Sequence, residues 1–198
     1  MLGLLAETDA RWAEAALADL DAVLRDHAHC EMKAASHALS LAARHPDDVA
    51  LVRKLVKVAQ EELEHFDRVL AILASRGVAI GTQPVAAYAA RLRARVQKLP
   101  RAAASALVDR LLVCAMIEAR SCERFKLLLE RMGESHELHA FYKDLFAAEA
   151  RHFREFVDLA AGASSAASAD ARLREIAAVE AEIVRERASS SDRASIHG

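Results

Sequence analysis

Two sets of glutamate and histidine residues recur in this chain at the same spacing, and their side chains are the best suited to chemistry. Glu31 lies 31 residues before Glu62, which begins a Glu-x-x-His motif that ends at His65. The second set repeats this spacing 87 residues later and consists of Glu118, Glu149 and His152. Four carboxylates and two imidazoles in this arrangement are the ligands expected for a carboxylate-bridged pair of iron or manganese ions inside a four-helix bundle.

The spacing within each Glu-x-x-His motif supports a metal site. Residues three apart project from the same face of a helix, so each motif can offer a carboxylate and an imidazole to one ion. Many oxygen donors with few nitrogens suit iron or manganese better than copper or structural zinc. One such motif on a charged helix is usually a surface feature. Two motifs, each preceded by a glutamate at the same interval, are much more specific.

Other acidic and histidine residues near these motifs do not repeat. The 87-residue offset pairs Glu61 with Ala148 and Glu64 with Arg151, which excludes both glutamates as repeated ligands. Three further residues without a symmetric counterpart remain candidates for a functional role beside the ligands, and they are His27, His29 and Glu123. Cys30 and Cys122 flank the candidate ligands and are interpreted as small core residues.

The composition predicts a soluble, all-helical protein. The 198 residues include only six glycines and three prolines, and 54% of them are hydrophobic. The net charge of −2 argues against a basic nucleic-acid binder as a whole, but a local basic patch stays possible. Three cysteines without a Cys-x-x-Cys pair favour neither a disulfide framework nor a rubredoxin-type centre. With no signal peptide or membrane span expected, we predict a cytoplasmic location.

Hydrophobic periodicity predicts one ferritin-like diiron domain over residues 1–188 and a flexible tail over 189–198. We expect a four-helix bundle with a long crossover that contains a short helix, and extra helices at both ends. The helices are expected at about 12–18, 19–44, 48–75, 85–98, 101–132, 135–160 and 169–188. Pro46 and Gly133 mark turns at the midpoints between the paired glutamates, so Glu31 should face Glu62 and Glu118 should face Glu149.

The expected crossover helix carries the densest basic stretch of the chain. Arg91, Arg95 and Lys98 share one face of it, and apolar residues occupy the opposite face. The basic face is either solvated or a strip that contacts phosphates, because lysine and arginine give sequence-independent affinity for RNA.

With these residues identified, the sequence resembles the tRNA 2-methylthio-N6-isopentenyladenosine hydroxylase family (MiaE). The resemblance covers about residues 1–188 and rests on the segments DHAHCEMKAASHAL, EELEHFDRVL, IEARSCERF and AAEARHFREF. It implies a non-haem diiron monooxygenase that uses O2 and electrons from a reductase system to hydroxylate the isopentenyl group of the tRNA nucleoside. It also implies that all six repeated residues bind iron. Apolar neighbours such as Leu63, Phe66, Ile117 and Phe153 could then exclude water.

Other functions of the same fold remain alternatives. A ferroxidase or iron-storage protein would use the same ligands, although the sequence carries no obvious signature of a cage. A rubrerythrin-type peroxidase usually has a Cys-x-x-Cys iron site, which this sequence lacks. A radical-generating subunit is disfavoured because the two tyrosines, Tyr88 and Tyr142, are distant in sequence from the candidate ligands.

Overall fold

A computed structural model describes residues 1–9, 11–82, 87–100 and 105–188, and in these ranges the chain forms α-helices and no strand. The helices are α1 (Arg11–Ala18), α2 (Leu20–Ala43), α3 (Val49–Ser75), α4 (Ala87–Val96), α5 (Ala106–Met132), α6 (His139–Gly162) and α7 (Ala166–Ala188). The all-helical prediction is confirmed. The expected tail over 189–198 and the expected helix start at Arg101 lie outside the described residues. Within the described part of the chain, no helix has the length and apolar character that a membrane span requires.

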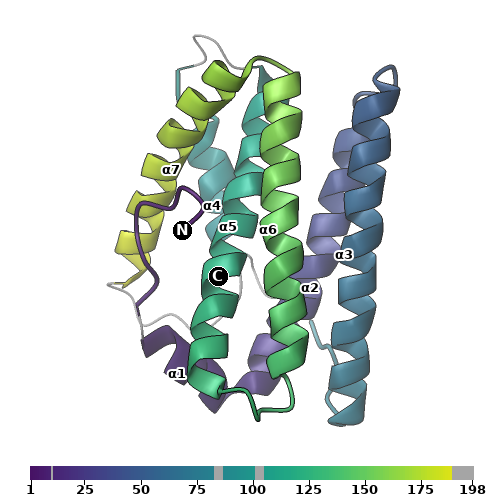
Figure 1. The fold of residues 1–198 in the computed structure, drawn as a ribbon, viewed down its shortest axis with the longest axis vertical. Coiled ribbons are helices and arrows are strands. Elements are labelled where there is room, and N and C mark those ends of the chain that lie inside the picture. Colours follow the sequence, from purple (N-terminus) through teal and green to yellow (C-terminus); the bar gives the residue numbers. More distant parts are fainter. Residues whose placement is uncertain (10, 83–86, 101–104, 189–198) are drawn as a thin grey trace. The chain divides into compact units, whose positions relative to one another are not determined.

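Residues 19–85 form a compact unit built on the antiparallel pair of α2 and α3 (Figure 1). Each helix begins with an aspartate cap, as Asp19 accepts a hydrogen bond from the backbone N–H of Ala22 and Asp48 accepts one from that of Leu51. Such caps satisfy backbone donors that have no partner inside the helix. The buried apolar side chains of the pair include Leu24, Ala28, Ala35, Leu55, Ala59 and Val69.

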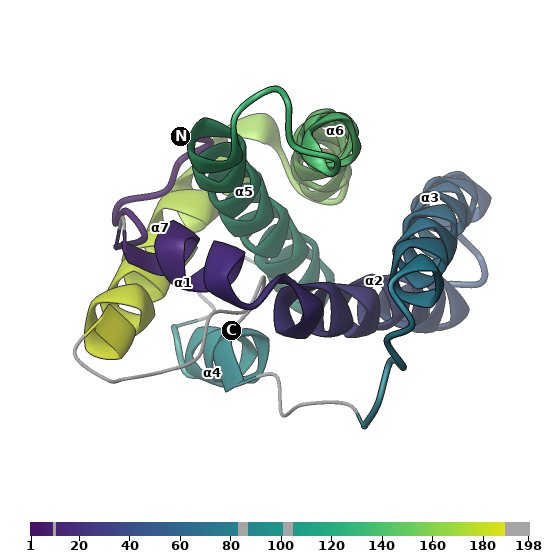
Figure 2. The same ribbon diagram turned by 90° about the horizontal axis from the view of Figure 1, so that it is seen from below.

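The remaining described residues form a second unit around α5 and α6, which pack along each other, with α7 against both (Figure 2). Helices α1 and α4 also pack on α5. Gly133 ends α5 with a φ of 71°, a backbone conformation that glycine adopts most easily. Helix α6 begins at His139 rather than near Ser135, because residues 133–138 form turns closed by backbone hydrogen bonds such as His136 N–H to the Gly133 carbonyl.

The start of α7 is earlier than expected because Ser165 caps it. The Ser165 hydroxyl accepts a hydrogen bond from the backbone N–H of Ser168, so the helix begins at Ala166. One face of α7 belongs to the core of its unit, because Ile176, Ile183 and Glu180 are completely buried.

A buried ion network connects α7 to α5 and α4. The Arg120 guanidinium, fully inaccessible to solvent, donates hydrogen bonds to both carboxylate oxygens of Glu180 at 2.9 Å. The Tyr88 hydroxyl donates to Glu180 Oε1 at 2.8 Å. Burial, and then the negative charge of Glu180, raise the pKa of Tyr88 well above its usual value of 10, so the phenol stays protonated.

The same arginine holds the N-terminal segment in place. Arg120 pairs with Glu123, and it donates a hydrogen bond to the backbone carbonyl of Ala6 at 3.0 Å. Glu123 accepts two further hydrogen bonds from Thr8, at 2.8 Å from its backbone N–H and 2.6 Å from its hydroxyl. Most hydrogen-bonding atoms of the buried charges are therefore satisfied, which limits the cost of removing them from water.

Candidate metal centre

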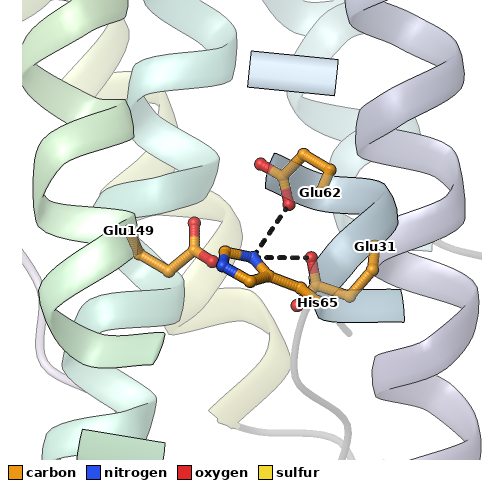
Figure 3. A group of neighbouring side chains, drawn as sticks. All are labelled: Glu31, Glu62, His65 and Glu149. Carbon is orange, nitrogen blue, oxygen red and sulfur yellow. Dashed lines mark ion pairs between the residues drawn. The ribbon is translucent and has the colours of Figure 1, made fainter. Parts of the chain in front are cut away.

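The α2–α3 pair brings one set of the repeated residues together. Glu31 of α2 and Glu62 and His65 of α3 are all buried, with exposed fractions of 4%, 1% and 7%. One donor atom from each lies within 4.8 Å of those of the other two. His65 Nδ1 is 3.5 Å from Glu62 Oε2 and 3.8 Å from Glu31 Oε2, as the dashed lines in Figure 3 show. The prediction that Glu31 and Glu62 face each other across the hairpin agrees with this geometry.

A histidine one turn earlier on α2 contacts the first of these carboxylates. His27 Nε2 lies 2.6 Å from Glu31 Oε1, and His27 is completely buried. Burial by itself raises the pKa of Glu31, but the hydrogen bond and the charge of His27 lower it, with smaller contributions from His65 and Glu62. The net result is a pKa of about 2, so Glu31 is a carboxylate that accepts the imidazole N–H.

The α5–α6 pair carries the second set. Glu118 of α5 and Glu149 and His152 of α6 are exposed by only 4%, 2% and 2%. His152 Nδ1 lies 3.4 Å from Glu149 Oε2, a spacing close to that of the matching pair on α3. The two Glu-x-x-His motifs therefore have the same local geometry, as their repeated spacing predicts.

A buried thiol accompanies this second set. Cys122 of α5 lies one turn after Glu118, and its Sγ is 3.6 Å from the backbone carbonyl of Phe146. Burial raises the pKa of the Cys122 thiol, and the negative charges of Glu149 and Glu118 raise it further. The thiol is therefore protonated and donates a weak hydrogen bond, which agrees with its interpretation as a small core residue and makes it a poor metal ligand.

The donor atoms in each half fit a hard, positively charged ion. Burying carboxylates without a compensating charge is costly, and a bound cation removes that cost. At 3.5 Å and 3.8 Å, the spacings from His65 to its two carboxylates exceed an ordinary hydrogen bond. They match the roughly 3–4 Å between donors that share one ion at about 2.1 Å. A cluster of buried carboxylates and an imidazole is thus compatible with a metal site.

The residues that the repeat excluded as ligands have other surroundings. Glu64 is exposed, and Glu61 lies 3.6 Å from Lys57 in an exposed pair. Glu123 belongs to the buried network of Arg120. His29 is 4% exposed, and neither of its ring nitrogens has a hydrogen-bond partner among the described residues.

The apolar neighbours of the motifs differ from one another in burial. Phe153 is buried and Phe66 and Ile117 are partly buried, which agrees with a role in excluding water. Leu63 is 46% exposed, so the expectation for this residue is wrong. Position 63 is about 100° further around α3 than Glu62, which turns its side chain away from the buried face.

The basic face of α4 is partly neutralised by α7. Arg95 lies 2.7 Å from Glu186 and 3.7 Å from Glu182, and Arg91 also pairs with Glu186. All four side chains are at least one-third exposed. Lys98 is exposed.

Two features escaped the sequence-based reasoning. The Arg120–Glu180 pair joins residues 60 positions apart on helices with no shared motif, so no spacing rule links them. A signal was nevertheless present, because Arg120 lies among small and apolar residues of α5 that must be buried. The contact of His27 with Glu31 follows the four-residue spacing of helical neighbours and could have been expected from it.

Comparison with known proteins adds a family and a fold. Residues 2–197 match the family described as tRNA-(MS[2]IO[6]A)-hydroxylase (MiaE). A Pseudomonas putida KT2440 protein named tRNA 2-(methylsulfanyl)-N(6)-isopentenyladenosine(37) hydroxylase is 45% identical over 150 residues, which are 75% of this chain and 70% of that protein. The protein of the same name from Salmonella typhimurium LT2 is 33% identical over 134 residues, which are 68% of this chain and 47% of the relative.

A solved structure is similar over almost the whole chain. It is described as protein 43 with aldehyde deformylating oxygenase activity, from Synechococcus, and it shares 35% sequence identity with this chain at a TM-score of 0.88. The match covers 98% of this chain and 95% of the other. The predicted fold class, an all-α ferritin-like bundle with additional helices, is confirmed by this similarity.

Proposed function

The chain belongs to the MiaE family of tRNA hydroxylases, and we propose that it hydroxylates the isopentenyl group of 2-methylthio-N6-isopentenyladenosine in tRNA, with O2 and external electrons as co-reactants. The observation that carries this proposal is the doubled, buried Glu and His set in a chain that matches the family over residues 2–197. As an enzyme of this family the protein is an oxidoreductase.

We propose that the metal centre contains two iron ions, which the six repeated residues bind. These are Glu31, Glu62, His65, Glu118, Glu149 and His152, each less than a tenth exposed. A bound iron pair would supply the activation of O2 and the oxidation of an allylic C–H bond, which no amino-acid side chain can perform.

The protein's own contribution is to position the ligands and to keep the site dry. Glu31 and Glu62 approach the same imidazole from facing helices, so the helix pair already places the donors of one half near one another. Buried apolar residues such as Phe153 keep water away from the oxidising centre. The protonated Cys122 thiol fills space beside Glu118 without adding a charge.

For the tRNA, we propose contacts from Arg91, Arg95 and Lys98. The ion pairs of the two arginines with Glu186 join exposed groups, and such pairs contribute little to stability. A tRNA phosphate can therefore replace the carboxylate at small cost. The proposed reaction requires electrons from a reductase system. We place the protein in the cytoplasm, where tRNA is modified.

The direct test is aerobic incubation of the iron-loaded protein with a chemical reductant and isopentenylated tRNA, followed by mass analysis of the nucleosides. The expected result is a gain of one oxygen atom in the modified adenosine, and labelled O2 should supply it. Iron uptake and oxidation without any change in the tRNA would instead favour a ferroxidase or storage function. A peroxidase would consume hydrogen peroxide added in a parallel reaction and leave the nucleoside unchanged.

A second test concerns the basic residues of α4 and of the turn that follows it. Changing Arg91, Arg95 and Lys98 together to Glu should weaken tRNA binding and reduce its dependence on salt. The matched control changes three exposed basic residues of α3 to Glu, and these are Arg53, Lys54 and Lys57. It alters the net charge by the same amount. If both triple variants lose the same affinity, the effect is due to total charge and the assignment of the α4 face is wrong.

A further inference from the structure

The two halves of the candidate centre differ in one buried contact. In the α2–α3 half, His27 Nε2 lies 2.6 Å from Glu31 Oε1. The other oxygen of the same carboxylate, Oε2, is the one nearest His65, at 3.8 Å. The two oxygens of Glu31 therefore have separate tasks, since one accepts a hydrogen bond from its own helix and the other faces the candidate ligands of α3.

The second half has no equivalent histidine. The position one turn before Glu118 is Cys114, which is buried and carries a thiol in place of an imidazole. A thiol is a weak hydrogen-bond donor and is much shorter than an imidazole. The 87-residue repeat therefore relates the six candidate ligands but does not include His27, the residue that contacts Glu31.

The His27 contact is rigid. The two residues are four apart on a helix, the spacing at which side chains meet, and both are at least 96% buried. A hydrogen bond to a carboxylate is stronger than one between neutral groups, and burial excludes competing water. Glu31 cannot turn its Oε1 toward a metal without breaking this bond.

We propose that His27 is a positioning residue that restricts Glu31 to coordination through Oε2 alone, and that it thereby makes the metal position at Glu31 and His65 different from the one at Glu118 and His152. This inference rests on the proposed iron pair. With Glu31 limited to one donor oxygen, the ion beside His65 has one ligand position fewer filled by protein. That ion is the one with room for an exogenous ligand.

The test uses metal binding rather than turnover as its main measurement. Cobalt(II) serves as a probe, titrated anaerobically into the metal-free protein while its visible absorption and the heat of binding are recorded. The wild-type protein should bind two ions with distinguishable spectra and affinities. His27→Ala should change the affinity of one of the two by about 10–100-fold, the range typical for loss of a group that supports a metal ligand, should change the visible spectrum of that ion because Glu31 Oε1 is released, and should leave the other ion unchanged.

Two further variants separate positioning from packing. His27→Gln keeps a donor N–H within reach of Glu31, so it should return both the affinity and the cobalt spectrum of that ion toward those of the wild type. His29→Ala removes another buried histidine two residues away that makes no hydrogen bond among the described residues, so both ions should bind as in the wild type. Circular dichroism and a thermal melt establish that each variant is folded.

Several outcomes would overturn the inference. Equal weakening of both ions by His27→Ala, no change in either, or the same change with His29→Ala would show that His27 only packs. Failure of the wild-type protein to bind two ions would remove both this inference and the proposed function. The reverse case is distinguishable, because the expected metal titrations without hydroxylation of tRNA would support the role of His27 and refute the proposed reaction alone.

Discussion

Removal of the Glu180 carboxylate is the most informative perturbation of the fold that positions the α5–α6 half of the site. Glu180→Ala deletes three hydrogen bonds, one from Tyr88 and two from Arg120, and leaves the Arg120 cation in a completely buried position. Breaking a buried ion pair by removing one partner costs about 3–5 kcal/mol. Arg120 keeps its second carboxylate partner, Glu123, so we expect the lower end of that range, about 3 kcal/mol.

This loss can be measured by urea denaturation followed by circular dichroism at 222 nm, and by thermal unfolding. For a chain of this size, 1 kcal/mol corresponds to about 2–4 °C, so the melting temperature should fall by roughly 6–12 °C. Glu182→Ala is a matched control on the same helix, because the Glu182 side chain is 65% exposed and lies 3.7 Å from its partner Arg95. It should cost at most about 1 kcal/mol.

Comparison of Glu180→Ala with Glu182→Ala tests whether the buried network stabilises the fold. If Glu180→Ala and Glu182→Ala lower the free energy of unfolding equally, or if Glu180→Ala costs less than about 1 kcal/mol, the buried network does not stabilise the fold as reasoned. The same measurement on metal-free protein excludes an indirect effect of metal loss.

Three further predictions concern local structure and can be checked with the same unfolding assays and a thiol titration. Gly133→Ala should cost about 1–3 kcal/mol, because the φ of 71° and ψ of 163° are strained for any residue with a side chain, whereas Gly162→Ala at the end of α6 should be neutral or stabilising. Asp48→Ala should lower the free energy of unfolding by about 1 kcal/mol, because it removes the cap of α3. An equal loss from Asp47→Ala would contradict this. The three buried cysteine thiols should react with a disulfide reagent only after unfolding, and rapid reaction of Cys122 in the native protein would contradict its raised pKa.

The candidate ligands could be predicted from the sequence because their positions obey local rules. Helical spacing places a glutamate and a histidine three apart on one face, and a hairpin places residues equidistant from its turn at the same height. Pro46, Asp48 and Gly133 are turn and cap residues whose preferences are strong. These rules act within one helix or between adjacent helices, so they reach the proximity of Glu31, Glu62 and His65 and the spacing of Glu149 and His152.

The rest of the fold depends on contacts that no local rule describes. Nothing in the sequence near Glu180 indicates that its partner is Arg120, or that α7 carries a completely buried charge. Similarly, the charges of Arg91 and Arg95 predicted a solvated or RNA-binding face but not their pairing with Glu186. Such pairs depend on which helices pack together, and that is decided by the burial of the whole apolar surface.

The buried network also has a consequence for the order in which the chain can fold. Its contacts join residues that are far apart in sequence, with 115 positions between Thr8 and Glu123 and 60 between Arg120 and Glu180. The two helical hairpins are local and can form early, whereas contacts of long sequence separation form slowly. During synthesis, Arg120 has no Glu180 to pair with until α7 has left the ribosome. The unit that carries Glu118, Glu149 and His152 is therefore completed only after α7 has been made.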